Sequence, residues 1–138
     1  MIELSVVIPI HNEAQSLDAL YRELTAALEG CGRSYEVVAV DDGSTDESFA
    51  LLSQIQTADA RWRIIRFRRN FGQTAAFSAG FAHARGRLIV TSDGDLQNDP
   101  RDMASMVETL EQGGYDIVCG WRKDRKDAFV SRPLPSMF

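Results

Sequence analysis

Two carboxylates separated by a single residue, Asp93 and Asp95, directly follow the short apolar run Leu88–Thr91. On an extended segment, both can bind one divalent cation, because Mg²⁺ and Mn²⁺ prefer oxygen ligands and also bridge to phosphates. Gln97 offers an amide oxygen at the same spacing. The competing interpretation is that the two acids only cap a helix or solvate a turn. Since the pair follows a buried strand, and more acids follow a neighbouring one, we favour the metal site.

Polar residues also follow four other segments that we predict to be strands. The five clusters are Asn12-Glu13, Asp41-Asp42, Arg68-Arg69-Asn70, Asp93 with Asp95, and Arg122-Lys123. In an open parallel sheet, the ligand crevice lies at the carboxyl ends of the strands. Five polar clusters at one edge therefore predict a binding site there.

Each of the weaker signals has an ordinary structural alternative. The Asp41–Ser44 segment fits an Asx turn as well as a carboxylate that contacts a base or ribose. Glu13 can be a helix-start acid, and Pro9 should mark the end of its strand. The basic residues of segment 122–126 can be a solvated charge run, but their place after a strand favours anion binding.

The elements that must position these residues alternate strictly between strand and helix. We predict strands at Leu4–Ile10, Tyr35–Val40, Trp62–Phe67, Leu88–Thr91 and Asp116–Gly120. The intervening helices include one over 14–29, with Asn12 as N-cap and Gln15 completing a capping box. With no hairpin signal, this order predicts one α/β domain with a doubly wound, mostly parallel sheet and flanking helices.

Composition narrows the possible functions. The chain has 138 residues, 44% of them hydrophobic, and a net charge of −5. This net negative charge argues against general binding of nucleic acid, which needs a basic surface. Cys31 and Cys119 are far apart and have no metal-binding spacing, so a disulfide scaffold or zinc ribbon is excluded. No signal peptide or membrane-spanning run is visible, so we expect a cytoplasmic protein.

Two common glycine-rich phosphate-binding motifs do not occur in the sequence. There is no GxGxxG after the first strand and no GxxxxGK[ST] anywhere. This weakens the dehydrogenase and ATPase interpretations. His11 and His83 have no evident Ser or Cys partner, so a catalytic triad is a weak hypothesis.

Five segments occur in a recognisable order and spacing: VVIPIHNE (6–13), VDDGSTD (40–46), RNFGQTAA (69–76), SDGDLQNDP (92–100) and GWRKDRKD (120–127). Together they resemble the family 2 glycosyltransferases of the GT-A fold, and within them the polyprenyl-phosphate sugar transferases related to dolichol-phosphate mannose synthase. VDDGSTD is common to many such enzymes. RNFGQTAA and the DGDLQ segment narrow the resemblance to the polyprenyl-phosphate branch.

The resemblance implies roles for the matching positions. Pro9 and Glu13 would line a nucleotide pocket, and Asp42 would contact the base. Asp93 would lie by the ribose and diphosphate, and Asp95 would hold Mg²⁺ or Mn²⁺. Gln97 would assist the metal, while Arg122 and Arg132 would reach the acceptor phosphate.

The implied reaction moves a sugar from a UDP- or GDP-sugar to an undecaprenyl or dolichyl phosphate, with inversion at the anomeric carbon. A phosphate monoester is already a dianion at neutral pH, because its second pKa is about 6. It needs positioning more than deprotonation, so no general base is assigned. Asp95 and Arg122 are the predicted catalytic residues.

Length is the main departure from the family, whose members carry about another hundred residues of catalytic domain. We therefore expect a truncated chain that can form a homo-oligomer and that binds nucleotide but transfers little sugar to lipid. We expect the parent protein at the cytoplasmic face of the membrane. A nucleotide-binding module without turnover is one alternative. The other is a haloacid-dehalogenase-type phosphatase, although Gln97 stands where that class needs Thr or Val.

Overall fold

The computed structural model describes residues 1–92, 94 and 100–116. Within them lie strands β1 (Leu4–Ile10), β2 (Tyr35–Asp41), β3 (Trp62–Arg66) and β4 (Leu88–Thr91). The helices are α1 (Leu17–Gly30), α2 (Ser48–Ala58), α3 (Gln73–His83) and α4 (Asp102–Gly113). The four strands form one sheet in the order β3-β2-β1-β4, and all three pairings are parallel. The predicted α/β class is therefore confirmed.

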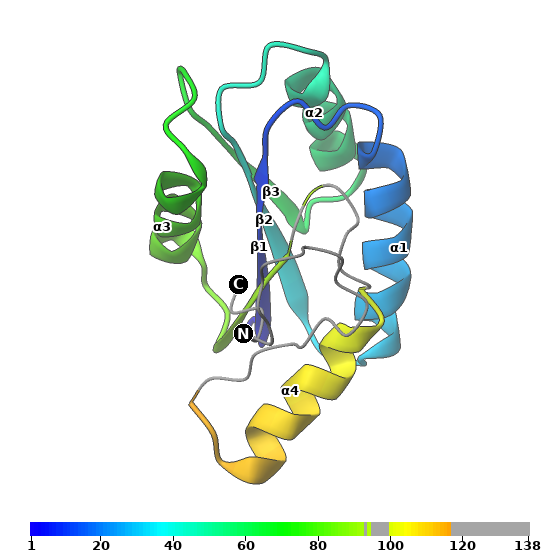
Figure 1. The fold of residues 1–138 in the computed structure, drawn as a ribbon. Helices are drawn as coiled ribbons and strands as arrows, with labels where there is room; N and C mark the ends of the chain where they lie inside the picture. Colours follow the sequence, from blue (N-terminus) through cyan, green and yellow to red (C-terminus); the bar gives the residue numbers. More distant parts are fainter. Residues whose placement is uncertain (93, 95–99, 117–138) are drawn as a thin grey trace, which may run out of the picture.

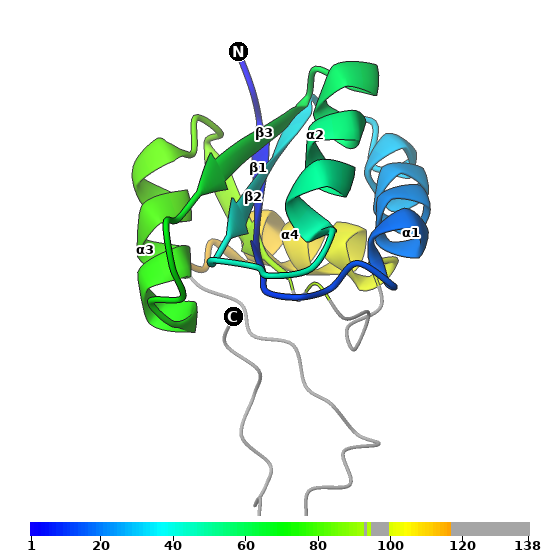
Figure 2. The ribbon, with the colours of Figure 1, turned by 90° about the horizontal axis from the view of Figure 1, so that it is seen from above.

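Helices cover both faces of the sheet (Figures 1 and 2). Helix α3 packs on one face, and α1, α2 and α4 lie on the other. Alternate strand residues point to opposite faces. Thus Val6 and Ile8 join the larger core, whereas Val7 joins Val38 beneath α3. Both faces of β1 and β2 are buried, which explains their continuous apolar, β-branched sequences.

Helix α3 approaches the sheet closely because Gly80 faces it. A Cβ atom at Gly80 would lie 2.2 Å from Cγ1 of Val7. The absence of a side chain at this position therefore has a steric reason.

The sequence placed most elements correctly, and the differences lie at their ends. Strand β2 ends at Asp41, one residue later than predicted. Helix α1 begins at Leu17 instead of 14, and its N-cap residue Ser16 makes no side-chain capping bond, so the capping box of Asn12 and Gln15 is wrong. Strand β3 ends at Arg66, one residue earlier than predicted. The predicted fifth strand lies outside the described residues except for Asp116, which is in a bend.

A buried carboxylate ties the amino ends of the strands together beneath α3. Glu36, on β2, is 2% exposed and accepts hydrogen bonds from Ser5 Oγ (2.7 Å), Arg63 Nη1 (2.9 Å) and the backbone N–H of Arg85 (2.7 Å). Burial by itself would raise the pKa of Glu36, but these hydrogen bonds outweigh it and lower the pKa overall.

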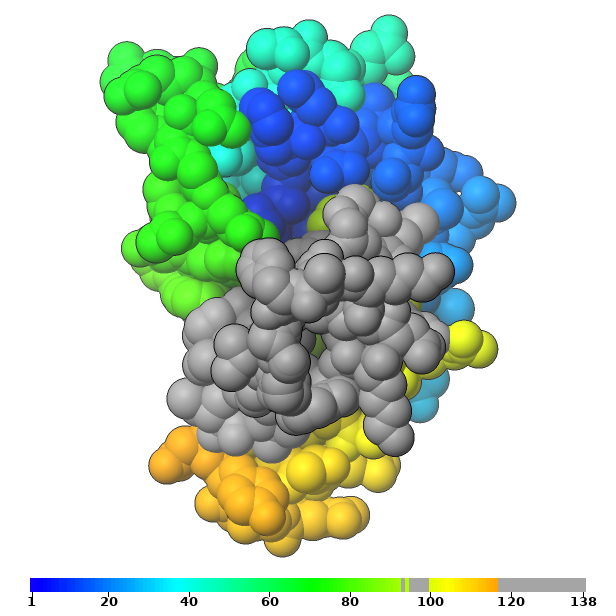
Figure 3. Space-filling model, viewed as in Figure 1, coloured from blue at the N-terminus to red at the C-terminus, as the bar shows by residue number. Residues whose placement is uncertain are grey.

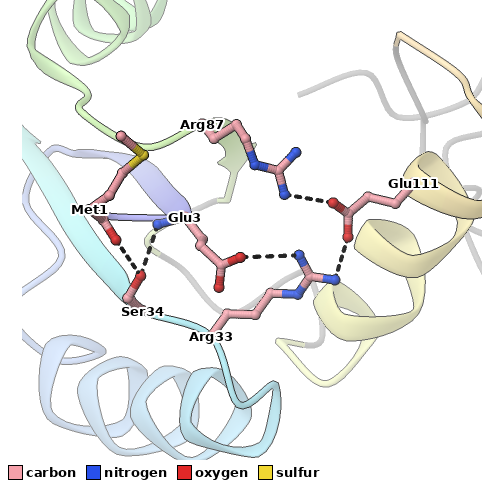
Figure 4. Close-up of polar contacts among 6 residues, drawn as sticks. All are labelled: Met1, Glu3, Arg33, Ser34, Arg87 and Glu111. Carbon is pink, nitrogen blue, oxygen red and sulfur yellow. Dashed lines mark hydrogen bonds and ion pairs between the residues drawn. The ribbon is translucent and has the colours of Figure 1, made fainter.

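Helix α4 is fastened to the same end of the sheet by ion pairs (Figure 4). The Glu111 carboxylate lies between Arg33 and Arg87; its Oε2 is 2.6 Å from Arg87 Nη2, and its Oε1 pairs with Arg33 Nη2. Arg33 also faces Glu3, at 4.0 Å. The pKa of Glu111 is lowered, chiefly by its hydrogen bond from Arg33. None of the helices in the described ranges is long and apolar enough to cross a membrane.

Candidate functional site

The end of β1 is paired on one side only. Its pairing with β4 stops at Val7, opposite Thr91, while its pairing with β2 continues to Ile10. The carbonyl oxygen of Val7 accepts a hydrogen bond from the β4 side, and the carbonyl oxygen of Ile10 accepts one from the β2 side. Successive residues of a strand direct their backbone groups to opposite sides, so Pro9 faces the side on which β4 has ended. Because proline has no N–H, it has no backbone donor on that side. Pro9 therefore marks where β1 and β4 separate, and the strand itself continues to Ile10.

A single side chain connects the loops that follow β1 and β2. Asn12 has a left-handed backbone, with φ of 52°. Its Oδ1 accepts the backbone N–H groups of Thr45 (2.8 Å) and Asp46 (3.2 Å), and its own N–H donates to Ser44 Oγ at 2.9 Å. Asn12 thus joins the two loops instead of capping α1.

Further bonds in the same place hold the start of α2. Ser48 Oγ accepts the backbone N–H of Glu13 at 2.9 Å. The Asp46 carboxylate accepts the N–H groups of Ser48 (2.8 Å) and Ala14 (3.3 Å). Hydrogen bonds from Ser48, first its side chain and then its backbone, lower the pKa of Asp46. The 11–14 and 44–48 segments are therefore fixed to each other by side chains.

The paired acids after β2 have different partners. Asp41 Oδ1 accepts the backbone N–H of Ser44 at 3.1 Å, which is the turn that the sequence allowed. Asp42 instead accepts the backbone N–H groups of Phe71 (2.7 Å) and Gly72 (3.1 Å) and the Asn70 side-chain amide (3.2 Å). Asp42 is only 4% exposed. Its hydrogen bonds to residues 70–72 therefore hold the loop after β3 in place.

The loops after β2 and β3 touch through their backbones. Gly43 has φ of 67°, and a Cβ atom there would lie 2.2 Å from the carbonyl carbon of Arg69 and 2.3 Å from the nitrogen of Asn70. Only glycine permits both this conformation and this approach. Three loops therefore meet at the carboxyl edge of the sheet, the upper edge in Figure 1.

A cavity of about 270 Å³ opens where these loops meet. Its lining residues are Pro9, Ile10, His11, Glu13, Asp42, Asn70, Gly72, Gln73 and Gly94. Gly94 packs against β1, since a Cβ atom there would lie 3.2 Å from the Pro9 carbonyl oxygen. The cavity thus combines a small apolar wall with carboxylates, amides and an imidazole.

Three of the predicted site residues are brought together in this cavity: Pro9, Glu13 and Asp42. The other five, Asp93, Asp95, Gln97, Arg122 and Arg132, lie outside the described residues. Gly94, between the two predicted metal ligands in the sequence, is itself part of the lining. In the described ranges no three His, Cys, Asp or Glu side chains are grouped to hold a metal.

The sequence placed Asn70 at this edge but assigned a specific role neither to it nor to His11. Asn70 lines the cavity and its Nδ2 lies 3.2 Å from His11 Nδ1, which in turn lies 2.8 Å from the Asp42 carbonyl oxygen. His11 had been given no role. Its position directly after β1, beside Asn12, was the one available signal.

Solved structures with the same fold define its class. The TM-score is 0.69 to Staphylococcus aureus TarS residues 1–349 in complex with UDP, at 18% identity over 91% of this chain and 38% of that one. It is also 0.69 to the mannosyltransferase PcManGT from Pyrobaculum calidifontis in complex with GDP-Man and Mn²⁺, at 23% identity over 78% of this chain and 32% of that one. The fold is that of the GT-A glycosyltransferases.

Sequence comparison then gives the family. The model of glycosyl transferase family 2 matches residues 5–138, and the chain belongs to that family. It is 48% identical over 136 residues to a dodecaprenyl-phosphate galacturonate synthase from Rhizobium johnstonii, covering 98% of this chain. It is 43% identical over 130 residues to an undecaprenyl-phosphate 4-deoxy-4-formamido-L-arabinose transferase from Edwardsiella ictaluri, covering 94% of this chain. In both comparisons the chain spans 40% of the relative's length.

Proposed function

We propose that the cavity binds the nucleoside diphosphate part of a nucleotide-sugar, and that the whole protein transfers the sugar to a polyprenyl phosphate with inversion. The observation that carries the proposal is the convergence of Pro9, Glu13, Asp42 and Gly94 on one cavity at the carboxyl edge. This edge is where open parallel sheets bind nucleotides. Membership of family 2, and relatives named for transfer to polyprenyl phosphates, support the same activity.

The residues of the cavity contact different parts of the nucleotide. Pro9 and Glu13 contact the nucleotide from the end of β1. Asp42 lies under the base, and its carboxylate also fixes the 70–72 backbone. Because these loops are already bonded to one another, little ordering is needed when the nucleotide enters.

Asp93, Asp95 and Gln97 supply the oxygen ligands for Mg²⁺ or Mn²⁺. Their chemistry fits such a hard cation, and the cavity position of Gly94 supports their placement beside the diphosphate. When bound, the metal neutralises charge that develops on the leaving diphosphate. We assign Asp95 a catalytic role through this ion.

The basic residues Arg122 and Arg132 position the acceptor phosphate. Its dianion attacks the anomeric carbon from the face opposite the nucleoside diphosphate. The new carbon–oxygen bond forms as the bond to the diphosphate breaks, so the configuration inverts. No side chain has to remove a proton from this acceptor, which explains the absence of a general base among the assigned residues.

The experiment that tests the site is a calorimetric titration of the chain with UDP and with GDP, each with and without Mn²⁺. We expect one nucleotide to bind in a metal-dependent manner, and Asp95→Ala to abolish that dependence. Asp18→Ala is the matched control, since Asp18 lies on the solvent side of α1 with its side chain 82% exposed.

Binding of neither nucleotide to the folded chain, or the same metal dependence in Asp95→Ala, would refute the assigned site. The transfer step is tested separately on the whole protein, with a nucleotide-sugar and undecaprenyl phosphate, by the appearance of a sugar-carrying lipid. Substitution of Arg122 by Gln is expected to weaken this transfer while nucleotide binding is kept.

A further inference from the structure

A second hollow, of about 670 Å³, lies next to the nucleotide cavity on the side of β3. Arginines at the end of β3 and in the following loop form one wall, and the turn after β2 forms another. Among the described residues, the two hollows have His11 and Asn70 in common. We call this hollow the arginine groove and define it by Arg66, Arg68, Arg69, Ser44 and Thr45. In Figure 3, its walls come from the green, cyan and blue segments of the upper half.

The three arginines of the groove are all exposed. Within the described ranges none of them forms an ion pair, although other arginines of the chain do so. Arg66 is opposite Asp41 in the β2–β3 register, yet the two side chains are not within ion-pair distance. Two acids flank the turn: the Asp42 carboxylate is occupied by Asn70 and by the backbone of Phe71 and Gly72. The Asp46 carboxylate is occupied by Ser48 and Ala14. The groove is thus a local cationic site on a chain whose net charge is −5.

Aromatic rings hold two of these guanidinium groups in place. Arg66 lies 3.9 Å from the centroid of the Phe49 ring, and Arg69 lies 4.1 Å from that of Phe71. The Phe71 ring in turn packs edge-on against Phe67, with centroids 5.6 Å apart. A guanidinium stacked on a ring loses less freedom when it binds an anion, and its N–H groups still point outward in the plane.

The opposite wall adds a neutral donor. Ser44 Oγ accepts the N–H of Asn12, and in the described part of the chain its own O–H has no acceptor. Gly43, with φ of 67°, brings this turn close to the backbone of Arg69. Ser44 and the three arginines therefore line the same hollow.

We propose that the arginine groove is a phosphate-binding site, separate from the nucleotide cavity. Three guanidinium groups suit a doubly charged phosphate better than they suit a singly charged carboxylate. Arginine donates paired hydrogen bonds to phosphate oxygens. The phosphate comes from a soluble phosphorylated compound or from the headgroup of an anionic lipid, because both present the same oxygens.

The test follows backbone amide NMR shifts of the chain during titration with inorganic phosphate at constant ionic strength. We expect saturable shifts at residues 43–45 and 66–69, with smaller changes around Pro9 and Gly94. Arg68→Gln and Arg69→Gln should each weaken binding at least about tenfold, because each removes charge-assisted hydrogen bonds to the phosphate oxygens. Arg22→Gln on α1, an exposed arginine far from the groove in the fold, is the control of equal charge change.

A second arm replaces phosphate by phosphatidylcholine vesicles with and without phosphatidic acid, and measures co-sedimentation. Arginine-dependent binding to the phosphatidic acid vesicles identifies the lipid source, and binding of free phosphate alone identifies the soluble source. No binding in either arm, or equal weakening by Arg22→Gln, would overturn the proposal. Nucleotide titration of Arg68→Gln separates the two sites, because we expect its metal-dependent nucleotide binding to be kept.

Discussion

The carboxylate of Asp42 determines the position of the loop after β3, so its removal is the most informative single change. It accepts two backbone N–H groups, from Phe71 at 2.7 Å and Gly72 at 3.1 Å. A hydrogen bond to a charged group contributes about 1.5–3 kcal/mol. Two such bonds give an upper estimate of about 3–6 kcal/mol if they add. Phe71 is 51% exposed, so water can reach part of the vacated space. We therefore expect Asp42→Ala to lower the free energy of unfolding by about 2–4 kcal/mol.

Urea denaturation followed by circular dichroism measures this loss. Asp42→Asn is an intermediate variant. Its amide oxygen can accept a hydrogen bond from one of the two N–H groups, but its NH₂ group faces the other N–H and cannot accept a bond from it. It should lose about half as much stability as Asp42→Ala. In both variants nucleotide binding should weaken, since Asn70 and Gly72 line the cavity. A loss below about 0.5 kcal/mol in Asp42→Ala, the level of an ordinary surface substitution, would refute the role given to this carboxylate.

Three further predictions concern the scaffold. Gly80→Ala places a methyl group against the buried valine of β1 and should cost about 1–3 kcal/mol in urea denaturation. At Gly30 a Cβ atom would meet nothing within 4 Å, so Gly30→Ala should change the free energy of unfolding by no more than about 0.5 kcal/mol. Equal effects of Gly80→Ala and Gly30→Ala would contradict the close packing of α3. Glu111→Gln should lower the thermal midpoint more than the exposed Glu108→Gln does, and the difference should shrink in high salt. An effect independent of salt would exclude the ion pairs as its cause. The lowered pKa of Glu36 stabilises the fold fully above its unfolded pKa of about 4.3, and this contribution is lost as the pH falls through the folded pKa. Glu36→Gln should therefore flatten the acid limb of a stability–pH curve, and an unchanged limb would contradict the assignment.

The strands were predictable because their signal is local. Leu4–Ile10 and Leu88–Thr91 are short β-branched runs with polar residues on either side, and the structure has strands with these bounds. The parallel arrangement followed from the alternation with helices, since parallel strands need a long crossover. That arrangement also placed Pro9, Glu13 and Asp42 at one edge.

The start of α1 was not predictable in the same way. Asn12 followed by Gln15 has the local pattern of a capping box. The partners that Asn12 uses, Thr45 and Asp46, lie in another loop, and a local pattern carries no information about them. The same holds for Asn70, whose importance depends on contacts with His11 and Asp42.

The bonds of Asn12 have a consequence for the order in which the chain folds. They join residues that are 32 to 34 positions apart. Closing a loop of that length costs entropy before any such contact forms, so these contacts are late events unless β1 and β2 have already paired. Asn12→Ala should then accelerate unfolding and leave the folding rate almost unchanged, giving a φ-value near zero in stopped-flow kinetics. The loops around the cavity at the carboxyl edge would be the last part of the described structure to assemble and the first to open.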